Sequence, residues 1–316
     1  MSAPLLVIVG PTGAGKSALA MGCAEALDGE IVSADSVQVY RGLDIGTAKP
    51  TAEEQVRVRH WCIDVADPSE AFDVTTWRTL ADAAIEDITA RGKTAIVCGG
   101  TGFYVRVLLY GLDEMPAISP ETRAQVREEV ARLGAQAVHA RLAQIDPESA
   151  ARIAPNDRQR LSRALEVHAQ TGVPLSTYHQ AAAIRPARYP ARIFGVWPPR
   201  PVLYAQIETR AKQMWRAGVA DEVRRALDQG VVSESGPLAS ACYRPMVAHV
   251  RGEDVGEAPV DALARAHRRY AKRQLTWFRG IGRRDAPIHH VDPTQTDALD
   301  FILTTWSRSG GDPRPR

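Results

Sequence analysis

The sequence turns on one stretch near its start, Leu5-Leu6-Val7-Ile8-Val9 followed by Gly10-Pro11-Thr12-Gly13-Ala14-Gly15-Lys16-Ser17. The five apolar residues predict a short buried strand that ends at a glycine. The Ala-rich segment 17–27 predicts a helix directly after the loop. The eight loop residues match G-x-x-x-x-G-K-[ST] in the strand–loop–helix context that this pattern requires. They therefore predict a phosphate-binding loop.

The chemistry of such a loop follows from its residue types. Its glycines let successive backbone N–H groups curl around an anion, and the start of the helix adds a favourable partial charge. We expect Lys16 to contact terminal phosphate oxygens and Ser17 to ligate a Mg²⁺ ion that bridges them. The pattern leaves open which phosphates are held and whether a phosphoryl group is transferred.

Strand and helix signals alternate beyond this loop. Further strands are predicted at 30–34, 61–65 and 94–98, and a helix at 74–91. From about residue 119 the strand signals stop, and Ser119-Pro120-Glu121 and Asp146-Pro147-Glu148 each read as a helix start, followed by a helix over 159–171. Strand character returns only at 192–197, and amphipathic helices follow.

These signals predict an α/β fold with a P-loop NTPase-like parallel sheet covered by helices and an inserted all-helical domain. The predicted core comprises 1–116 and 191–306, with helices at its C-terminal end. The predicted helical insertion spans 117–190, and residues 307–316 are expected to form a disordered tail.

The composition excludes several classes of protein. Of the 316 residues, 45% are hydrophobic and 24% charged, as in ordinary globular proteins. The apolar run at 5–9 is far shorter than a spanning helix needs, and no basic segment precedes it as in a signal peptide. The four cysteines lack CxxC spacing. We therefore expect a cytoplasmic protein with reduced thiols, no zinc site and no membrane partner.

Charge is distributed unevenly. Residues 1–150 contain 13 basic against 21 acidic side chains, and residues 151–316 contain 26 against 16. Five cations share one predicted helix face, namely Arg265, Arg268, Arg269, Lys272 and Arg273, with Tyr270, Trp277 and Phe278 interleaved. A second basic cluster consists of Arg152, Arg158, Arg160 and Arg163. Both clusters are typical of nucleic-acid binding, although the helix could equally be a solvated face with its aromatic rings in the core.

Three single residues permit two interpretations each. Asp35, after the second strand, could order metal-bound water or accept a proton, or it could cap a turn. Thr101, beside Gly99 and Gly100, could donate to a phosphate oxygen or cap the helix predicted at 102–109. Arg210 could clamp a diphosphate or form a surface pair. The strand at 94–98 ends in glycines and not in the aspartate of a Walker B element, which disfavours an ordinary NTPase.

The chain resembles the tRNA dimethylallyltransferases (tRNA isopentenyltransferases) of the bacterial type. The resemblance runs from Leu5 to about Arg279 and is carried by five segments: 10–17; Ser33-Ala34-Asp35-Ser36-Val37-Gln38-Val39-Tyr40-Arg41-Gly42-Leu43-Asp44-Ile45-Gly46-Thr47-Ala48-Lys49-Pro50; Gly99-Gly100-Thr101-Gly102-Phe103-Tyr104; Asn156-Asp157-Arg158-Gln159-Arg160-Leu161-Ser162-Arg163-Ala164-Leu165-Glu166; and Ala271-Lys272-Arg273-Gln274-Leu275-Thr276-Trp277-Phe278-Arg279. The stretch Asp44–Pro50 is particularly specific to this family.

The resemblance implies a reaction that the loop alone does not. The loop would hold the diphosphate of dimethylallyl diphosphate with Mg²⁺, and no phosphoryl group would move. The exocyclic N6 amine of the adenosine on the 3′ side of the anticodon, in tRNAs that read codons beginning with U, would attack the allylic carbon and release diphosphate. Asp35 matches the general base of the family. Lys16, Ser17 with Mg²⁺, Thr101 and Arg210 would stabilise the leaving diphosphate.

The resemblance also implies where tRNA is contacted, and that the protein is a monomer. The residues expected to contact tRNA are Asp35, Ser36, Val37, Gln38, Thr101, Arg123, Gln159, Arg160, Leu161, Ser162 and Arg163, together with Lys272 and Arg273 from the basic helix. The helical insertion would grip the anticodon stem-loop, whose bases can be splayed out and recognised.

One departure and three rival functions remain. Where the family usually has a Gly-Tyr pair, this chain has Cys242-Tyr243. A small-molecule or nucleoside kinase shares the phosphate loop and would bind ATP. An adenylate isopentenyltransferase would act on free nucleotide and would not need the two basic surfaces. A non-catalytic RNA-binding protein would not need Lys16, Ser17 and Asp35 together.

Overall fold

The central strand of the fold is β1 (Leu5–Val9), which is buried along its whole length. It pairs with β4 (Thr94–Gly99) on one side and with β5 (Ala191–Val196) on the other. In the computed structural model the described residues are 4–112, 115–183, 186–254, 256–281, 287–294 and 297–308. Within them the sheet has six parallel strands in the order β3-β2-β4-β1-β5-β6, with β2 at Gly29–Ser33, β3 at His60–Trp61 and β6 at Ile288–Val291.

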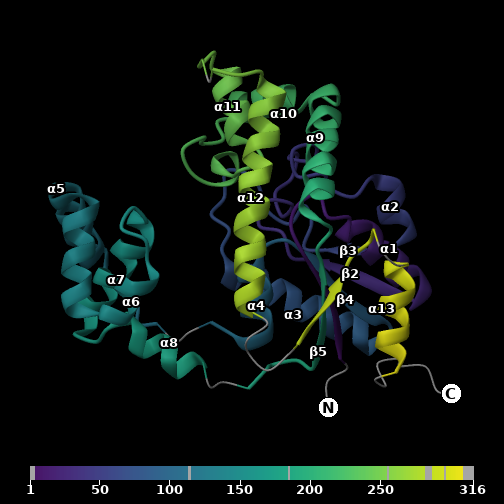
Figure 1. Cartoon of the computed structure of the whole chain (residues 1–316), viewed down its shortest axis with the longest axis horizontal. Coiled ribbons are helices and arrows are strands. Elements are labelled where there is room, and N and C mark those ends of the chain that lie inside the picture. The colour runs from purple at the N-terminus through teal and green to yellow at the C-terminus, as the bar shows by residue number, and fades with distance from the viewer. Residues whose placement is uncertain are drawn as a thin grey trace. The chain divides into compact units, whose positions relative to one another are not determined.

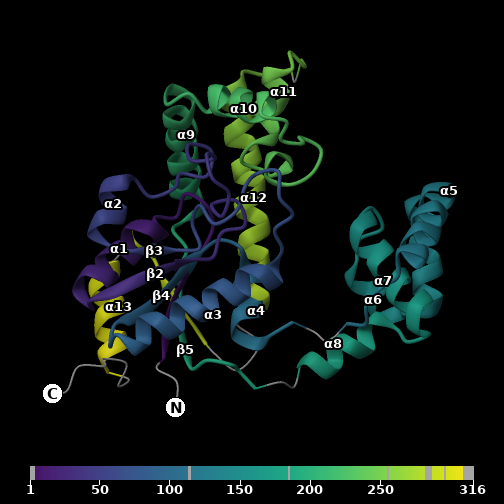
Figure 2. The ribbon, with the colours of Figure 1, turned by 180° about the vertical axis from the view of Figure 1, so that it is seen from behind.

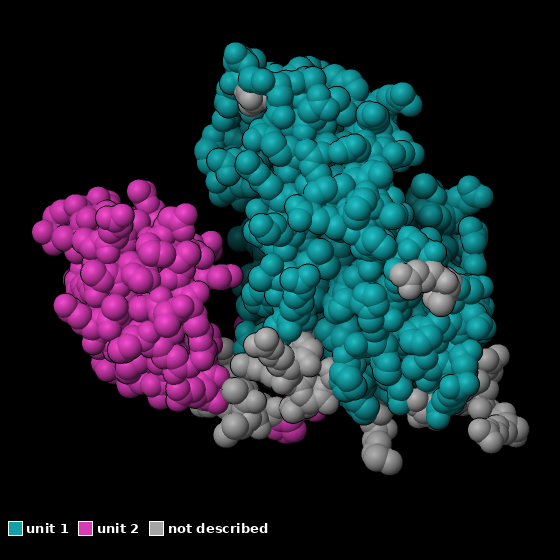
Figure 3. Space-filling model, in the orientation of Figure 1, with its two compact units in different colours: residues 1–109, 188–316 teal, residues 110–187 magenta. Residues whose placement is uncertain are grey.

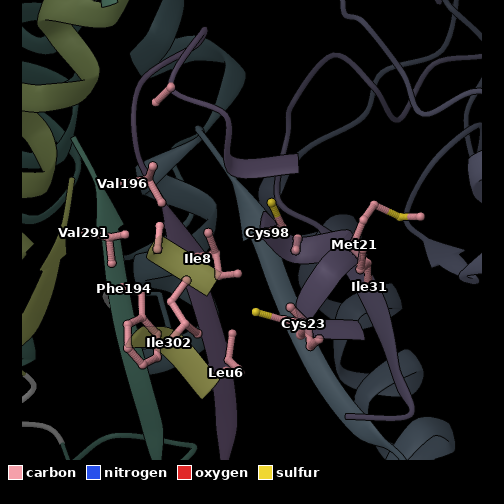
Figure 4. Close-up of a cluster of buried hydrophobic side chains, with 14 of the residues drawn as sticks. Leu6, Ile8, Met21, Cys23, Ile31, Cys98, Phe194, Val196, Val291 and Ile302 are labelled. Atoms are coloured by element: carbon pink, nitrogen blue, oxygen red, sulfur yellow. The ribbon is translucent and has the colours of Figure 1, made fainter. Parts of the chain in front are cut away.

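The strands read as continuous apolar runs because helices cover both faces of the sheet. Residues Leu6 and Ile8 of β1 face α1 and α13, and Phe194 of β5 packs beside them in one buried cluster (Figure 4). The helix α3 packs against β2 and β4, and Figure 2 shows it lying over the strands. The helices of this part of the chain are α1 (Lys16–Ala26), α2 (Ala52–Arg57), α3 (Val74–Ala90), α4 (Gly102–Tyr110), α9 (Arg200–Arg216), α10 (Val219–Asp228), the 3₁₀ turn η1 (Pro237–Ala239), α11 (Arg244–Val250), α12 (Pro259–Ile281) and α13 (Ala298–Ser307).

The chain divides into two compact units, which Figure 3 colours separately. Unit 1 comprises Met1–Leu109 and Arg188–Arg316, and unit 2 comprises Tyr110–Ala187. Unit 1 contains the sheet. The predicted boundaries of the insertion were 117 and 190, whereas the structure divides the chain at 110 and 187 because the segment after α4 already belongs to the helical unit.

Unit 2 is entirely helical in its described part. Its helices are α5 (Pro120–Ile145), α6 (Pro147–Arg152), α7 (Arg158–Thr171) and α8 (Leu175–Ala183). Both predicted helix starts are confirmed, since Ser119 Oγ accepts from the Thr122 N–H at 3.1 Å and Asp146 Oδ1 accepts from the Ser149 N–H at 3.0 Å. Val138, Leu142 and Leu161 are fully buried and form part of the unit's own apolar core.

The predicted strands and helices around the phosphate loop are confirmed within one or two residues, with two exceptions. The predicted strand over 61–65 ends at Trp61, because Cys62 and Asp64 have positive φ angles of 60° and 56°. The edge strand β6 was not predicted; it has four residues, two of them histidines, and among the described residues it pairs with β5. Of the tail predicted as disordered, Ser307 ends α13, and residues 309–316 lie outside the described residues.

Two long helices of unit 1, α9 and α12, run side by side, as both Figure 1 and Figure 2 show. Their inner faces contribute residues to the carboxyl end of the sheet, where parallel α/β proteins place their ligands. No helix in the described part of the chain is long and apolar enough to span a membrane.

Candidate active site

The phosphate loop lies between β1 and α1, at the carboxyl end of the central strand. Gly13 and Gly15 have φ angles of 81° and 83°, in the left-handed region that glycine adopts without strain. Gly15 is the N-cap of α1, and no described side chain caps that helix end. The N–H groups of its first turn are therefore available to an anion, as the motif predicted.

Lys16 projects into a cavity next to this loop, which it lines together with Thr12 and Ser17. Its Nζ donates a hydrogen bond to the Pro11 carbonyl at 2.7 Å. Burial lowers the pKa of Lys16 to about 8, and the nearby guanidinium of Arg210 acts in the same direction. Neighbouring Asp35 partly opposes that shift. An anionic ligand would raise this pKa again and keep the ammonium group charged above pH 8.

Asp35 lines the same cavity and also fixes a turn. Its Oδ1 accepts from the backbone N–H groups of Val37 at 2.9 Å and Gln38 at 3.3 Å. Within the described chain no hydrogen bond goes to its Oδ2. The turn-capping and functional interpretations are therefore compatible, because one oxygen is anchored and the other can accept a proton from a ligand.

Thr101 hydrogen-bonds to the turn that carries Asp35. Its Oγ1 accepts from the Ser36 N–H at 3.0 Å and lies 3.3 Å from the Ser36 hydroxyl. Tyr270 of α12 also hydrogen-bonds to Thr101, and burial raises the pKa of Tyr270 above its usual range. Thr101 thus joins the turn after β2 to α12, which orients the loop that carries Asp35.

Arg210 reaches the same cavity from α9. Burial lowers the pKa of its guanidinium. Its Nη2 donates to the Thr47 carbonyl at 3.4 Å, whereas its Nε is buried without a partner among the described residues. A buried donor without an acceptor is costly, so this side chain is suited to an anionic ligand. The interpretation as a surface pair is not supported.

Cys242, the departure from the family pattern, also lines the cavity. Burial and the charge of Asp35 raise the pKa of its thiol to about 12, so it is uncharged at neutral pH. The side chain occupies space where the family usually has a glycine.

Gln274 is a site residue that the sequence analysis did not assign. Its Oε1 accepts from the Thr12 N–H at 2.8 Å, and its Nε2 donates to the Gly100 carbonyl at 2.9 Å. It thereby ties the phosphate loop and the turn after β4 to α12. The stretch Ala271–Arg279 was noticed in the sequence, but nothing there indicated contacts with residues more than 170 positions away.

A Mg²⁺ ion in this cavity would be held mainly by oxygens of a bound phosphate ligand, because the protein alone offers few metal ligands there. Among the described residues, no group of three or more His, Cys, Asp or Glu side chains could hold a metal ion alone. Ser17 provides a hydroxyl beside Lys16, and Asp35 provides a carboxylate on the same cavity wall. Such a donor set suits an ion that keeps most of its ligands from phosphate and water.

The basic face of α12 is less uniform than its spacing suggested. Arg265 pairs with Glu257 and Arg268 pairs with Glu208 at 2.9 Å, both partners coming from other segments. Among the described residues, no carboxylate pairs with the remaining cations of this face, Arg269, Lys272 and Arg273. Two of the five cations on this face are therefore neutralised by carboxylates.

The aromatic rings of α12 differ in their surroundings. Tyr270 lines the cavity, and Phe278 is fully buried. Trp277 is half-buried and contacts the exposed Phe103 edge-on, with ring centroids 6.3 Å apart. Phe278 therefore belongs to the core and cannot stack on an RNA base.

The other residues predicted to contact tRNA divide between the two units. Asp35 and Gln38 line the cavity in unit 1, and Ser36 and Val37 lie in the turn between them, to which Thr101 hydrogen-bonds. In unit 2, Arg123 is exposed on α5, and Gln159–Arg163 form the first turns of α7. Leu161 is fully buried in the core of unit 2, so its side chain supports the helix and does not face solvent. The side chains of Arg160 and Arg163 are 62% and 40% exposed, and they form long surface ion pairs with Asp157 at 3.5 Å and Glu166 at 3.7 Å.

Comparisons with known proteins identify the family of the chain. The family model described as IPP transferase matches residues 38–281. The chain is 49% identical over 277 residues to a tRNA dimethylallyltransferase of Myxococcus xanthus, covering 87% of this chain and 90% of the relative. It is 49% identical over 299 residues to a tRNA dimethylallyltransferase of Anaeromyxobacter dehalogenans (strain 2CP-1), covering 94% and 97%.

Solved structures give the same result. The crystal structure of the tRNA isopentenylpyrophosphate transferase from Bacillus halodurans is similar with a TM-score of 0.71 and 36% identity, covering 99% of this chain and 97% of that one. A eukaryotic dimethylallyltransferase acting on tRNA has a TM-score of 0.79 at 24% identity, covering 99% and 81%, and shares the fold.

Proposed function

The chain belongs to the IPP transferase family, and we propose that it transfers the dimethylallyl group of dimethylallyl diphosphate to the N6 amine of the tRNA adenosine on the 3′ side of the anticodon. The acceptors would be tRNAs that read codons beginning with U. The observation that carries the proposal is one cavity in which a phosphate loop, a carboxylate and a guanidinium meet.

The diphosphate would lie on the phosphate loop. The N–H groups at the start of α1 and the Lys16 ammonium would bind its oxygens, and the Arg210 guanidinium of α9 would bind it as well. These donors are held in place before the reaction, so they stabilise the charge that grows on the leaving group without reorganising. Ser17 would ligate a Mg²⁺ ion bound with the diphosphate, which when present supplies further neutralisation of that charge.

Asp35 would act as the general base. The amine nitrogen forms a bond to the allylic carbon while the carbon–oxygen bond to diphosphate breaks, and the electron pair of that bond leaves with the diphosphate oxygen. The amine proton passes to Asp35 Oδ2, since Oδ1 is already held by two backbone N–H groups. An adenine amine is a poor nucleophile, so a positioned acceptor contributes directly to the rate.

Contacts with the rest of the tRNA would come from the exposed cations. Arg123, Arg160 and Arg163 of unit 2, and Lys272 and Arg273 of unit 1, would bind backbone phosphates. Such contacts fix the position of the RNA and depend on salt. We expect the protein to work as a monomer in the cytoplasm, where its RNA substrate is present.

Family membership favours allyl transfer over the kinase alternative, and the basic surface of α7 favours tRNA over free adenylate. A transfer assay with labelled dimethylallyl diphosphate, Mg²⁺ and unmodified tRNA tests both choices. Label should appear in tRNA and not in a transcript whose target adenosine is replaced by guanosine. Release of phosphate from ATP in the presence of a small acceptor, with no label in tRNA, would contradict the proposal.

A further inference from the structure

One buried carboxylate close to the cavity has no part in the reaction described above. Glu222 lies on α10 and is 2% exposed. Its Oε2 accepts from the N–H groups of Asp44 at 2.7 Å and Ile45 at 2.8 Å. Its Oε1 accepts from the Gly46 N–H at 3.0 Å and from the Tyr243 hydroxyl at 2.7 Å. Four donors therefore converge on one anion.

The three backbone donors come from consecutive residues of the loop after β2. Successive N–H groups that point to one spot form an anion-binding concavity, and the carboxylate of Glu222 occupies it. Hydrogen bonds to an ionised acceptor are stronger than neutral ones. No Lys or Arg of the described chain forms an ion pair with Glu222, so these four donors alone compensate its buried charge.

A close packing contact constrains the same loop independently. A Cβ atom on Gly46 would lie 2.4 Å from Cε1 of the fully buried Tyr243 ring, so only glycine permits this approach. Tyr243 also donates its hydroxyl to Glu222, and the preceding Cys242 lines the cavity. The loop, α10 and this cavity wall therefore meet at one carboxylate.

The loop fixed in this way carries the groups that orient the cavity. The Thr47 carbonyl, directly after Gly46, accepts from Arg210 Nη2 at 3.4 Å and from Gln38 Nε2 at 3.2 Å. The Gln38 N–H in turn donates to Asp35 Oδ1 at 3.3 Å. Among the described residues, the Thr47 carbonyl is the one hydrogen-bond acceptor of Arg210, so a shift of the loop changes where the guanidinium points.

We propose that Glu222 is a positioning residue that holds the loop 44–48 in place, so that the Thr47 carbonyl aims Arg210 at the diphosphate. The inference rests on the proposed function, because it assigns to Arg210 the diphosphate of the allyl donor. It concerns a residue that touches neither substrate and acts through another side chain.

The first test compares two isosteric substitutions of buried carboxylates. Glu222→Gln keeps the size of the side chain but turns an amide NH₂ toward backbone N–H groups. Glu30→Gln is the matched control, since Glu30 is 5% exposed, binds Arg91 at 2.5 and 2.7 Å and lies at the start of β2, away from the cavity. Both variants are measured well below their melting temperatures.

Glu222→Gln should raise the KM for dimethylallyl diphosphate and lower kcat, with kcat/KM reduced on the order of 10- to 100-fold, because small displacements of binding groups are costly. Its Kd for tRNA should stay within about twofold of wild type, and Glu30→Gln should change neither constant. Equal kinetics of Glu222→Gln and Glu30→Gln, with an active wild type, would overturn the inference. Absence of transfer by the wild type would instead refute the proposed function.

A double-mutant cycle then tests whether Glu222 acts through Arg210. If it does, Glu222→Gln should lower kcat/KM on the order of tenfold when Arg210 is present and less than about twofold in the Arg210→Ala background. Independent, multiplying losses would overturn the inference. If Glu222→Gln fails to fold, Tyr243→Phe replaces it in the same double-mutant cycle, because this variant removes one hydrogen-bond donor from the carboxylate and retains the ring.

Discussion

The cavity of unit 1 and the basic helix α7 of unit 2 hold their charged groups in opposite ways. Around the cavity the side chains are anchored by defined partners: Asp35 Oδ1 accepts two backbone N–H groups, and Gln274 bonds on both sides of its amide. On α7, Arg160 and Arg163 extend from an exposed surface, with acidic neighbours at 3.5 and 3.7 Å.

The difference separates chemistry from attachment. Groups that are fixed in advance and partly buried can stabilise a transition state without reorganising. Flexible cations in water contribute little to stability, but they can follow a phosphate backbone and release its counterions. Substitutions in the cavity should therefore change kcat, and substitutions on α7 should change the salt-dependent affinity for tRNA.

The largest expected effect is that of Asp35→Asn. The variant keeps an oxygen for the turn and loses the proton acceptor, so single-turnover transfer should fall on the order of 10²- to 10⁴-fold. Asp35→Ala should be at least as slow. Filter binding should give a tRNA Kd for Asp35→Asn close to that of the wild type. A large loss of tRNA affinity at an unchanged rate would contradict a role as base.

The next largest expected effect is a dependence of the affinity for diphosphate on pH, which arises from Lys16. Its pKa of about 8 in the ligand-free cavity must rise when an anion binds, so binding takes up a proton above pH 8. The affinity for diphosphate should be full below pH 8 and should fall by up to roughly tenfold per pH unit above it.

Calorimetry with diphosphate between pH 7 and 9.5 checks this dependence. Lys16→Met is the control, because it retains the titration of diphosphate itself. It should bind more weakly at pH 7 and show a shallower slope. The same slope for the wild type and Lys16→Met would refute the assignment.

Substitution of the exposed cations of α7 should have a smaller effect, on the affinity for tRNA. In Arg160→Gln/Arg163→Gln the Kd for tRNA should rise roughly 3- to 30-fold at physiological salt, and the slope of log K against log salt should shrink by about 1 to 2. Arg141→Gln is the control, since Arg141 lies in the same unit and pairs with Glu129. Transfer at saturating tRNA should be unchanged in both.

The smallest expected effect is that of removing one helix cap in each unit. Ser119→Ala removes the cap of α5 in unit 2, and Asp73→Ala removes the cap of α3 in unit 1, where Asp73 Oδ1 accepts from the N–H groups of Thr75 at 2.9 Å and Thr76 at 2.8 Å. Each should lower the free energy of unfolding by about 1 kcal/mol. Calorimetric melts should shift for both variants, while kcat at 25 °C stays within about twofold. A strong loss of kcat in Ser119→Ala alone would mean that unit 2 contributes to the chemistry.

Local signals in the sequence were sufficient for the phosphate loop, the parallel sheet and the caps of unit 2. Each of these depends on neighbouring residues, such as Gly15 before α1 or Ser119 before α5. The third strand was predicted too long because its apolar residues masked the turn at Cys62 and Asp64, of which only Asp is a residue type enriched at positive φ. The edge strand β6 was missed because four residues with two histidines lack an apolar pattern.

The candidate site was predictable where one motif supplies both a residue and its neighbours, as for Lys16 and Ser17. It was not predictable where distant segments meet. Gln274 contacts Thr12, and Glu222 binds the loop at Asp44, across separations that sequence spacing does not reveal. On the basic face of α12, the pair of Arg268 with Glu208 of α9 was likewise hidden in the sequence, whereas Glu257, which pairs with Arg265, lies just before the helix.

The most direct test measures two constants on two variants side by side. For Asp35→Asn and for Arg160→Gln/Arg163→Gln, we would determine the single-turnover rate at saturating tRNA and the tRNA Kd in the same buffer. The account predicts a crossed result, with the first variant slow but tightly bound and the second weakly bound but fast once saturated. A slow rate in the α7 variant, or weak binding with a normal rate in Asp35→Asn, would contradict the separation of chemistry from attachment.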